Sequence, residues 1–406
     1  MYEVYMQHLK ESLRLDAKYV LYTAVSVLIG CITGVVGSYF GILIKGATDL
    51  REANPWLIFL MPIGCVLIVW FYDITTGKKK ADTNTVLLAS EKHTPVPKRM
   101  AFQIFVATVF SHLLGGSVGR EGAALQLGGS IGYNTGRVLR IKEENLSIMV
   151  MSGMAGAFSA LLGVPLTAAI LAIEISSVGM IHYKALVPVV FASISSKYVA
   201  ILIGAPTLDE PKIFVPDVTI VNLLKVSLAG IILGLIAFLF IFAISYTNKI
   251  FKKLFENKYL KAFVGAVIVL GLTLIVGEQS YNGASTFLID KAIMGEARWF
   301  DFALKILFTA VSLAAGFKGG AIVPSFVIGA TSGCVLSNML SIDPSFGAAL
   351  GIGAVFCGVT NCPMAALLFC FEMFGLEGMP FYLLAVSISF VFSYEKSFYS
   401  AQEYYS

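Results

Sequence analysis

Apolar stretches separated by short polar segments make up most of the chain. Eleven such stretches occur, at 18–49, 55–72, 100–117, 146–175, 183–204, 219–251, 262–276, 301–315, 322–340, 345–375 and 380–393. A membrane-crossing helix needs about 20 mostly apolar residues, and several stretches reach that length. Gly and Pro divide others into shorter pieces, such as 153–163 followed by 165–175. Because lipid tolerates broken helices only around buried or water-filled sites, the pattern predicts an all-α, polytopic membrane protein with partly spanning helices around a transport site.

An internal repeat relates the two halves of the chain. An offset of 198 residues pairs Pro165 with Pro363, Glu174 with Glu372, Arg120 with Lys318 and Gly122 with Gly320. Apolar matches mean little in such a chain, whereas basic, acidic and proline matches in one register mean more. We therefore predict two membrane repeats, 1–210 and 211–406, joined by the exposed linker "GAPTLDEPKIFVPDV". Two-repeat transporters bind substrate where broken helices from both halves meet, and helix N-termini favour anions there.

The composition agrees with a protein that faces lipid. Hydrophobic residues make up 57% of the chain and charged residues 13%, about half the charged share of a soluble domain. The net charge of +4, without a basic tract interleaved with aromatics, argues against nucleic acid as a partner. All six cysteines lie within apolar segments and show no metal-ligand spacing, so we predict no disulfide and no metal. We also expect no cofactor.

The polar segments indicate the orientation in the membrane. The N-terminus, "MYEVYMQHLKESLRLDAKY", is amphipathic and lacks the apolar core of a signal peptide. The densest basic loops are "TGKKKADTNT", "HTPVPKRM" and "IFKKLFENKYLK". Because basic loops favour the cytoplasmic side, we expect a multi-pass protein of the cell (plasma) membrane. Its cytoplasmic N-terminal helix leads into the first span.

One acidic residue stands out among glycines. Arg120 and Glu121 lie within "LLGGSVGREGAALQLGGSIG", and an ionised side chain at membrane depth is a functional candidate. The alternative is a structural ion pair, since a carboxylate is favoured at a helix start. The repeat keeps the base as Lys318 but replaces the acid with Gly319, which favours a functional role. In contrast, Glu174 and Glu372 occupy matching positions, which indicates a shared structural task at helix ends.

A second motif suggests a competing chemistry. Two G-x-S-x-G matches place Ser117 and Ser130 among glycines, and His112 lies near Ser117 in sequence. A serine hydrolase needs a base and an acid around its nucleophile in a strand–turn–helix context, and that context is missing. Glycine-rich segments match this pattern easily, so we expect no enzyme. The tyrosines of "SYEKSFYSAQEYYS" are typical of interface anchors; the alternative is that one of them turns its hydroxyl into the pore.

Several of these motifs together resemble those of one family. "GSVGREGAALQLGGSIG" resembles the G-R-E-G-P signature of the CLC chloride channels and transporters, and "GGAIVP" resembles their G-x-F-x-P motif. "GVPLTAAILAIE" resembles their Pro-helix-Glu stretch, and Phe398–Tyr399 their tyrosine-bearing last helix. The resemblance covers nearly the whole chain. It implies a helical homodimer with inverted repeats and one anion path per subunit.

The resemblance also implies roles for particular residues. Glu121 would be the gate, which competes with the anion and carries a proton when displaced. The implied anion-binding residues are Gly119, Arg120, Gly122, Ala123, Gly320, Ala321, Ile322, Val323 and Tyr399, with Asp82 and Thr83 at the place of a further motif. The backbone N–H groups of the two glycine-rich segments would line the path, and the Tyr399 hydroxyl would bind the central anion.

The departures from the family pattern shape the choice of substrate. The family's Gly-Ser-Gly-Ile-Pro motif is replaced by about "KKADTNT", where Asp82 to Thr85 are expected to cap the next helix. Ile175 replaces the second proton glutamate of the family's antiporters. The "KGG" at 318–320 resembles the fluoride-exporting branch, although Ala321 replaces that branch's next glutamate and no methionine lies near Asp82.

We therefore expect a transporter that exchanges a small inorganic anion for protons, with fluoride favoured over chloride. Its partners would be the anion, protons, the lipid bilayer and a second copy of the chain. The alternative is a passive chloride or fluoride channel of the same fold. The absence of a protonatable side chain at Ile175 and Ala321 supports that alternative.

Overall fold

The computed structural model describes residues 2–76, 82–92, 94–207, 211–393 and 397–405, and the side chains from residue 18 onward. The first eight α-helices are α1 (Tyr2–Ala53), α2 (Met61–Thr76), α3 (Thr83–Lys92), α4 (Met100–Leu113), α5 (Glu121–Val138), α6 (Leu146–Leu162), α7 (Pro165–Glu174) and α8 (Leu186–Ile203). The next eight are α9 (Ile220–Leu254), α10 (Lys258–Val276), α11 (Phe287–Ile293), α12 (Asp301–Ala315), α13 (Ile322–Leu340), α14 (Pro344–Thr360), α15 (Pro363–Phe374) and α16 (Met379–Ser393). Short 3₁₀ turns lie at Pro55–Leu60, Glu143–Asn145 and Tyr183–Ala185.

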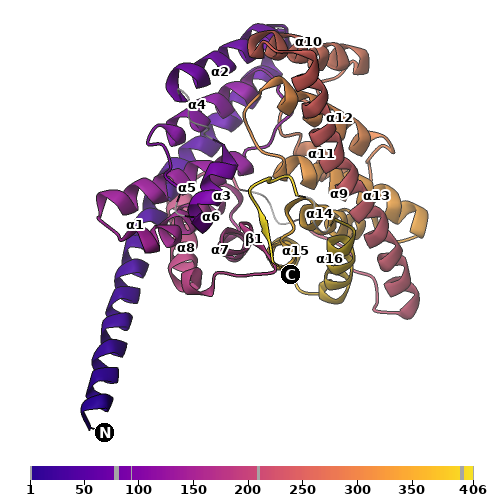
Figure 1. Ribbon diagram of the computed structural model, residues 1–406. Coiled ribbons are helices and arrows are strands. Elements are labelled where there is room, and N and C mark those ends of the chain that lie inside the picture. Colours follow the sequence, from indigo (N-terminus) through magenta and orange to yellow (C-terminus); the bar gives the residue numbers. More distant parts are fainter. Residues whose placement is uncertain (1, 77–81, 93, 208–210, 394–396, 406) are drawn as a thin grey trace.

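The prediction of a helical, polytopic membrane protein is confirmed. Within the described ranges, seven helical segments are long and apolar enough to cross a membrane, and five shorter apolar helices accompany them. The exception to the all-α expectation is a pair of two-residue parallel strands, β1 (Ser177–Val178) and β2 (Glu403–Tyr404). These strands join the loop after α7 to the C-terminal segment, which runs between the two halves in Figure 1.

The predicted helix breaks occur where backbone chemistry requires them. Gly163 ends α6 with a left-handed φ of +79°, and Pro165 begins α7. In the second half, Asn361 ends α14 with φ of +54°, and Pro363 begins α15. Left-handed residues satisfy the last carbonyls of a helix, and proline suits a first helical position because its missing N–H is not needed there.

Glycines let the helices of each half pack backbone to backbone. A Cβ atom on Gly128 of α5 would lie 2.0 Å from the carbonyl oxygen of Gly153 in α6. A Cβ atom on Gly329 of α13 would lie 2.3 Å from the carbonyl oxygen of Gly351 in α14. Both distances are below van der Waals contact, so only glycine permits these approaches. The helices α5, α6, α13 and α14 therefore form a dense, largely buried centre.

The two halves use equivalent elements in the same order. The bounds of α6 and α14 differ by the 198-residue offset of the repeat, as do the first residues of α7 and α15. Figure 1 shows the first half, in indigo to magenta, beside the second half, in orange to yellow. The basic residues at 78–80 lie outside the described part of the chain. Residues 208–210, which adjoin the proposed boundary between residues 210 and 211, also lie outside it. The division into two repeats therefore stays a prediction.

The first helix is longer than one membrane crossing. At about 1.5 Å per residue, the 52 residues of α1 exceed the roughly 30 Å of a hydrocarbon core. The apolar part begins at Lys18, and the segment before it projects from the body of the molecule in Figure 1. This shape agrees with a polar helix that leads into the first span.

Candidate functional site

Two glycines join the starts of α5 and α13. Gly119 donates its N–H to the carbonyl oxygen of Gly320 at 2.8 Å, and Gly320 donates to the carbonyl oxygen of Gly119 at 2.7 Å. A Cβ atom on Gly320 would lie 2.5 Å from the nitrogen of Gly122. The two glycine-rich segments predicted to form the path therefore meet, and only glycine fits at this crossing.

This pairing corrects one detail of the sequence-based expectation. The N–H groups of Gly119 and Gly320 were expected to face an anion, but each is bonded to the other segment. An antiparallel bridge satisfies both groups, which would otherwise be buried and unpaired. The donors that remain are in the first helical turns, whose N–H groups have no acceptor within their own helix. They belong to Gly122 and Ala123 in α5 and to Ile322 and Val323 after Ala321 in α13.

The carboxylate of Glu121 occupies the donors at the start of α5. Glu121 is fully buried. Its Oε2 accepts the backbone N–H of Arg120 at 3.0 Å, and its Oε1 accepts from Arg120 Nε at 3.2 Å. Arg120 also approaches the carbonyl oxygen of Leu161 at 3.4 Å. A helix N-terminus with unpaired N–H groups attracts anions, so the carboxylate lies where a small anion would bind.

Tyr399 points a free hydroxyl into the same region. Tyr399 is only 2% exposed, so it does not anchor the chain at a membrane surface as its sequence context alone suggested. Its Oη has no hydrogen-bond partner among the described residues, and it lies 3.8 Å from the position that a Cβ atom on Gly122 would take. Buried hydroxyls normally have a partner, so the unpaired Oη indicates a ligand position.

The segment before α3 contributes one hydroxyl to this region. Thr83 Oγ1 donates to the carbonyl oxygen of Gly122 at 3.3 Å. Asp82 is exposed, and its carboxylate bonds the first turn of α3. Its Oδ1 accepts from the N–H and from the Oγ1 of Thr85, each at 3.0 Å. Asp82 therefore caps α3, as expected, while Thr83 approaches the meeting point of the halves.

Lys318, the repeat partner of Arg120, has a different environment. Its ammonium lies 4.3 Å from the centre of the Tyr72 ring, and its N–H donates to Ser111 Oγ at 3.0 Å. The next residues, Ala321 to Val323, are buried and carry no titratable side chain, and Ile175 is also fully buried. Neither Ile175 nor Ala321, the two positions that the family resemblance indicates for a second proton carrier, can carry a proton.

The structural interpretation of Glu174 and Glu372 is confirmed, with an unexpected crossing. Glu174 accepts from the backbone N–H groups at the start of α15, at Met364 (3.0 Å) and Ala365 (2.8 Å). Glu372 accepts at the start of α7, from Leu166 (2.9 Å) and Thr167 (2.7 Å). Each carboxylate therefore caps a helix of the opposite half. This reciprocal bonding ties the halves together beside the site.

A cluster around Glu91 holds the C-terminal segment that carries Tyr399. Glu403 of β2 donates its N–H to Ser176 at 3.0 Å and forms an ion pair with Lys92. Glu91, in α3, accepts from His182 Nε2 at 2.6 Å and from Ser177 Oγ. Burial alone would raise the pKa of Glu91, but the bonds from His182 and Ser177 outweigh it and lower the pKa to about 2.

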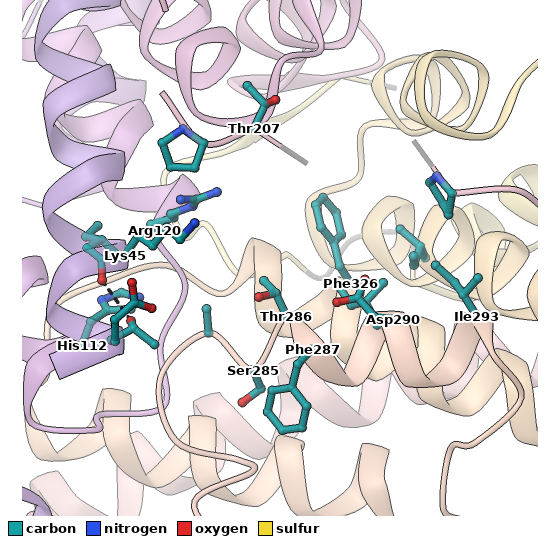
Figure 2. A pocket seen from close by; sticks show the side chains of 18 of the residues that line it. Lys45, His112, Arg120, Thr207, Ser285, Thr286, Phe287, Asp290, Ile293 and Phe326 are labelled. Atoms are coloured by element: carbon teal, nitrogen blue, oxygen red, sulfur yellow. Dashed lines mark hydrogen bonds between the residues drawn. The ribbon is translucent and has the colours of Figure 1, made fainter. Parts of the chain in front are cut away.

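A cavity of about 420 Å³ opens beside Arg120. It lies at the end of α1 far from the N-terminus and is walled by α11 and the segment after α8. Figure 2 shows Lys45, His112 and Arg120 on one side, with Asp290 and Phe326 across from them. This cavity connects the surface of the protein with the ion pair of Arg120 and Glu121.

Two buried cations near this cavity were not selected from the sequence. Arg51, at the end of α1, is 2% exposed, and Lys305, in α12, is fully buried. His112 was considered only as a base for Ser117. The sequence pattern could have identified Lys305, because it lies inside the apolar stretch 301–315. A charged residue in such a stretch is a functional candidate.

The contacts of Ser117 do not assemble a nucleophile with a base. Ser117 Oγ bonds Thr309 Oγ1 at 3.1 Å and accepts from Lys305 Nζ at 3.1 Å. The ring of His112 instead bonds the carbonyl oxygen of Thr108 through Nδ1. These contacts give Ser117 a structural role.

Comparisons with known proteins show which family the chain resembles. The model of the family described as "Voltage gated chloride channel" matches residues 64–394. A "Chloride/fluoride channel protein" of Pseudomonas syringae pv. tomato DC3000 is 32% identical over 389 residues, which cover 93% of this chain and 85% of that protein.

Solved structures show the same architecture. A CLC-type fluoride/proton antiporter superposes with a TM-score of 0.92 and 28% identity, covering 95% of this chain and 98% of that one. A slow cyanobacterial Cl⁻/H⁺ antiporter superposes with a TM-score of 0.75 and 19% identity, covering 92% and 94% of the two chains. The second likeness establishes the fold alone.

Proposed function

The chain belongs to the voltage gated chloride channel family, and we propose that it exchanges a small inorganic anion for protons across the cell membrane. Fluoride is favoured over chloride. The observation that carries this proposal is the carboxylate of Glu121, which is bonded to the N–H at the start of α5. There it occupies the position that helix termini offer to an anion.

Competition between this carboxylate and the anion links the two substrates. While ionised, Glu121 holds the Arg120 donors and blocks the path. Protonation removes its charge and weakens both bonds, so the side chain leaves and an anion takes its place. A departing anion lets the carboxylate return after it releases its proton. Because each ligand changes the affinity for the other, anion and proton movements are coupled.

The remaining contacts support a path for the anion between the two helix starts. Gly122 packs against Gly320, which directly precedes Ala321, Ile322 and Val323, so the first-turn N–H groups of Gly122 and Ala123 would bind the anion near this contact. The Tyr399 hydroxyl lies at the meeting point of the halves and donates to an anion bound there, while Thr83 Oγ1 bonds the Gly122 carbonyl. Gly119 and Gly320 act by bringing the two helix starts together.

The preference for fluoride rests on the relatives and on the "KGG" segment. A chloride/fluoride channel protein and a fluoride/proton antiporter are among the similar proteins. A passive channel remains the second candidate, because Ile175 and Ala321 carry no proton on the way to the other side. We further propose two inverted repeats, a homodimer and a cytoplasmic N-terminus.

The experiment uses purified protein in liposomes with an imposed fluoride or chloride gradient and a pH-sensitive dye inside. Exchange predicts uphill proton movement driven by the preferred anion. Glu121→Gln should abolish proton movement, while the exposed control Glu296→Gln should keep it. Anion flux that leaves protons at rest in the unaltered protein would establish a channel. Proton movement that persists in Glu121→Gln would refute the assigned gate.

A further inference from the structure

Two residues that line the cavity beside Arg120 each carry a buried polar atom without a partner among the described residues. Nε of Arg51 and Nε2 of His112 make no hydrogen bond within the described part of the chain. Both residues line the cavity, and their side chains are almost completely shielded from solvent outside it. Buried polar atoms are nearly always paired. Two unpaired ones on the same cavity therefore indicate a ligand.

The hydrogen bonds of the His112 ring define what Nε2 offers. His112 Nδ1 lies 2.9 Å from the carbonyl oxygen of Thr108. A carbonyl only accepts, so Nδ1 carries a hydrogen. In the neutral ring, Nε2 is then a lone pair that accepts, and in the protonated ring it donates. Arg51 is tied to the same residue, because its Nη1 donates to the carbonyl oxygen of His112 at 3.0 Å.

The charges around the ring favour an anion over a cation. Those acting on His112 are Arg51 from α1, Arg120 from the start of α5 and Lys305 from α12. Lys305 has no carboxylate partner in the described structure: it donates to Ser117 Oγ, Ser285 Oγ and the carbonyl oxygens of Tyr281 and Gly283. Arg120 itself is paired with the buried carboxylate of Glu121.

The acidic residues of the cavity lie at its rim. Asp49, Glu52 and Asp290 are exposed, and Glu52 is 3.5 Å from Arg51 with its side chain 60% exposed. Water screens exposed charges far more than buried ones. The interior of the cavity is therefore positive, although its residues include as many acids as lysines and arginines.

We propose that Arg51 and His112 form a second, outer binding site, which takes one small inorganic anion together with one proton. The anion accepts a hydrogen bond from Arg51 Nε–H. The proton comes from the solution on that side and lies between the anion and His112 Nε2. No other bond forms or breaks. In its neutral form, the site equally fits an undissociated acid, which accepts from Arg51 and donates to His112.

The site rests on the proposed function, because it lies along the same anion path. Its role is to deliver anion and proton as a pair to Arg120, whose guanidinium lines the cavity and bonds Glu121. The outer side of the path would then load both substrates in one step.

The test measures protons taken up per fluoride bound, by calorimetry in buffers of different ionisation enthalpy. Sodium fluoride is titrated into full-length Glu121→Gln, which lacks the proton of the gate. We expect proton uptake that approaches one per fluoride at this site. Adding His112→Asn should abolish it, since asparagine retains a donor toward Thr108 but nothing at Nε2. Adding Arg51→Gln should raise the dissociation constant of fluoride about tenfold or more.

Controls separate this site from the proposed function. Lys45→Gln removes an exposed cation of the cavity and should leave the proton count unchanged. Should His112→Asn not fold, His112→Gln serves, since it also cannot titrate. A proton count that persists without the His112 ring would overturn the site, as would fluoride binding with no proton uptake in Glu121→Gln. Failure of the exchange function appears separately in liposomes, as anion flux without proton movement in the unaltered protein.

Discussion

Replacing Tyr399 with phenylalanine removes one hydroxyl from the centre of the protein. That hydroxyl is buried and has no partner in the described structure. A buried polar group without a hydrogen bond costs about 1–3 kcal/mol, so the substitution should not lower the free energy of unfolding in the absence of anion. We expect Tyr399→Phe to unfold at the same temperature as the unaltered protein, or a few degrees higher.

The same substitution should weaken anion binding. A hydrogen bond to a charged group contributes about 1.5–3 kcal/mol, and each 1.4 kcal/mol is tenfold in affinity. Tyr399→Phe should therefore raise the dissociation constant of the transported anion by about 10- to 150-fold. The assay is isothermal titration of fluoride and of chloride, with thermal unfolding of the same samples with and without anion. Tyr399→Phe should thus lower the affinity for anion without lowering the unfolding temperature in the absence of anion.

Two other buried tyrosines provide matched controls. Tyr382 is also fully buried with an unpaired hydroxyl, but it packs against Phe346 away from the α5 start, so Tyr382→Phe should leave anion affinity unchanged. Tyr281 donates to Asp301 at 2.5 Å, so Tyr281→Phe should lower stability. A clear loss of stability in Tyr399→Phe without anion would refute the reasoning, and so would unchanged affinity for both anions.

Three further substitutions follow from the contacts at the site. Gly320→Ala places a Cβ atom 2.5 Å from the nitrogen of Gly122. It should cost about 1–3 kcal/mol as overpacking and reduce transport, as thermal unfolding and liposome flux will measure. Glu372→Ala removes charge-assisted bonds to the start of α7 and should lower stability by about 1.5–3 kcal/mol per lost bond; an unchanged unfolding temperature would contradict this. The folded-state pKa of Glu91 is lowered from 4.5 to about 2 by bonds that include His182. Its stabilisation is therefore complete above about pH 4.5 and lost as the pH falls toward 2. The difference in unfolding temperature between Glu91→Gln and the unaltered protein should shrink over that range, and a constant difference would contradict the shift.

Sequence and structure agree where the controlling chemistry is local. The breaks at Gly163 and Pro165 were predicted because a left-handed residue and a missing N–H act on the backbone beside them. The repeat correctly indicated that Glu174 and Glu372 have one structural task. It did not reveal that each carboxylate caps a helix of the opposite half, since that depends on contacts between residues 190 to 206 positions apart.

The sequence by itself determined the membrane class and the helix breaks and selected Glu121 as a candidate, because hydropathy, backbone chemistry and the cost of an ion in lipid act residue by residue. Only the tertiary structure decided which donors stay free. The amides of Gly119 and Gly320 bond each other, the hydroxyl of Tyr399 remains unpaired, and Arg51 and His112 share a cavity. These outcomes depend on how distant segments pack, because burial removes water as a partner and leaves each polar group only the neighbours that the fold brings to it.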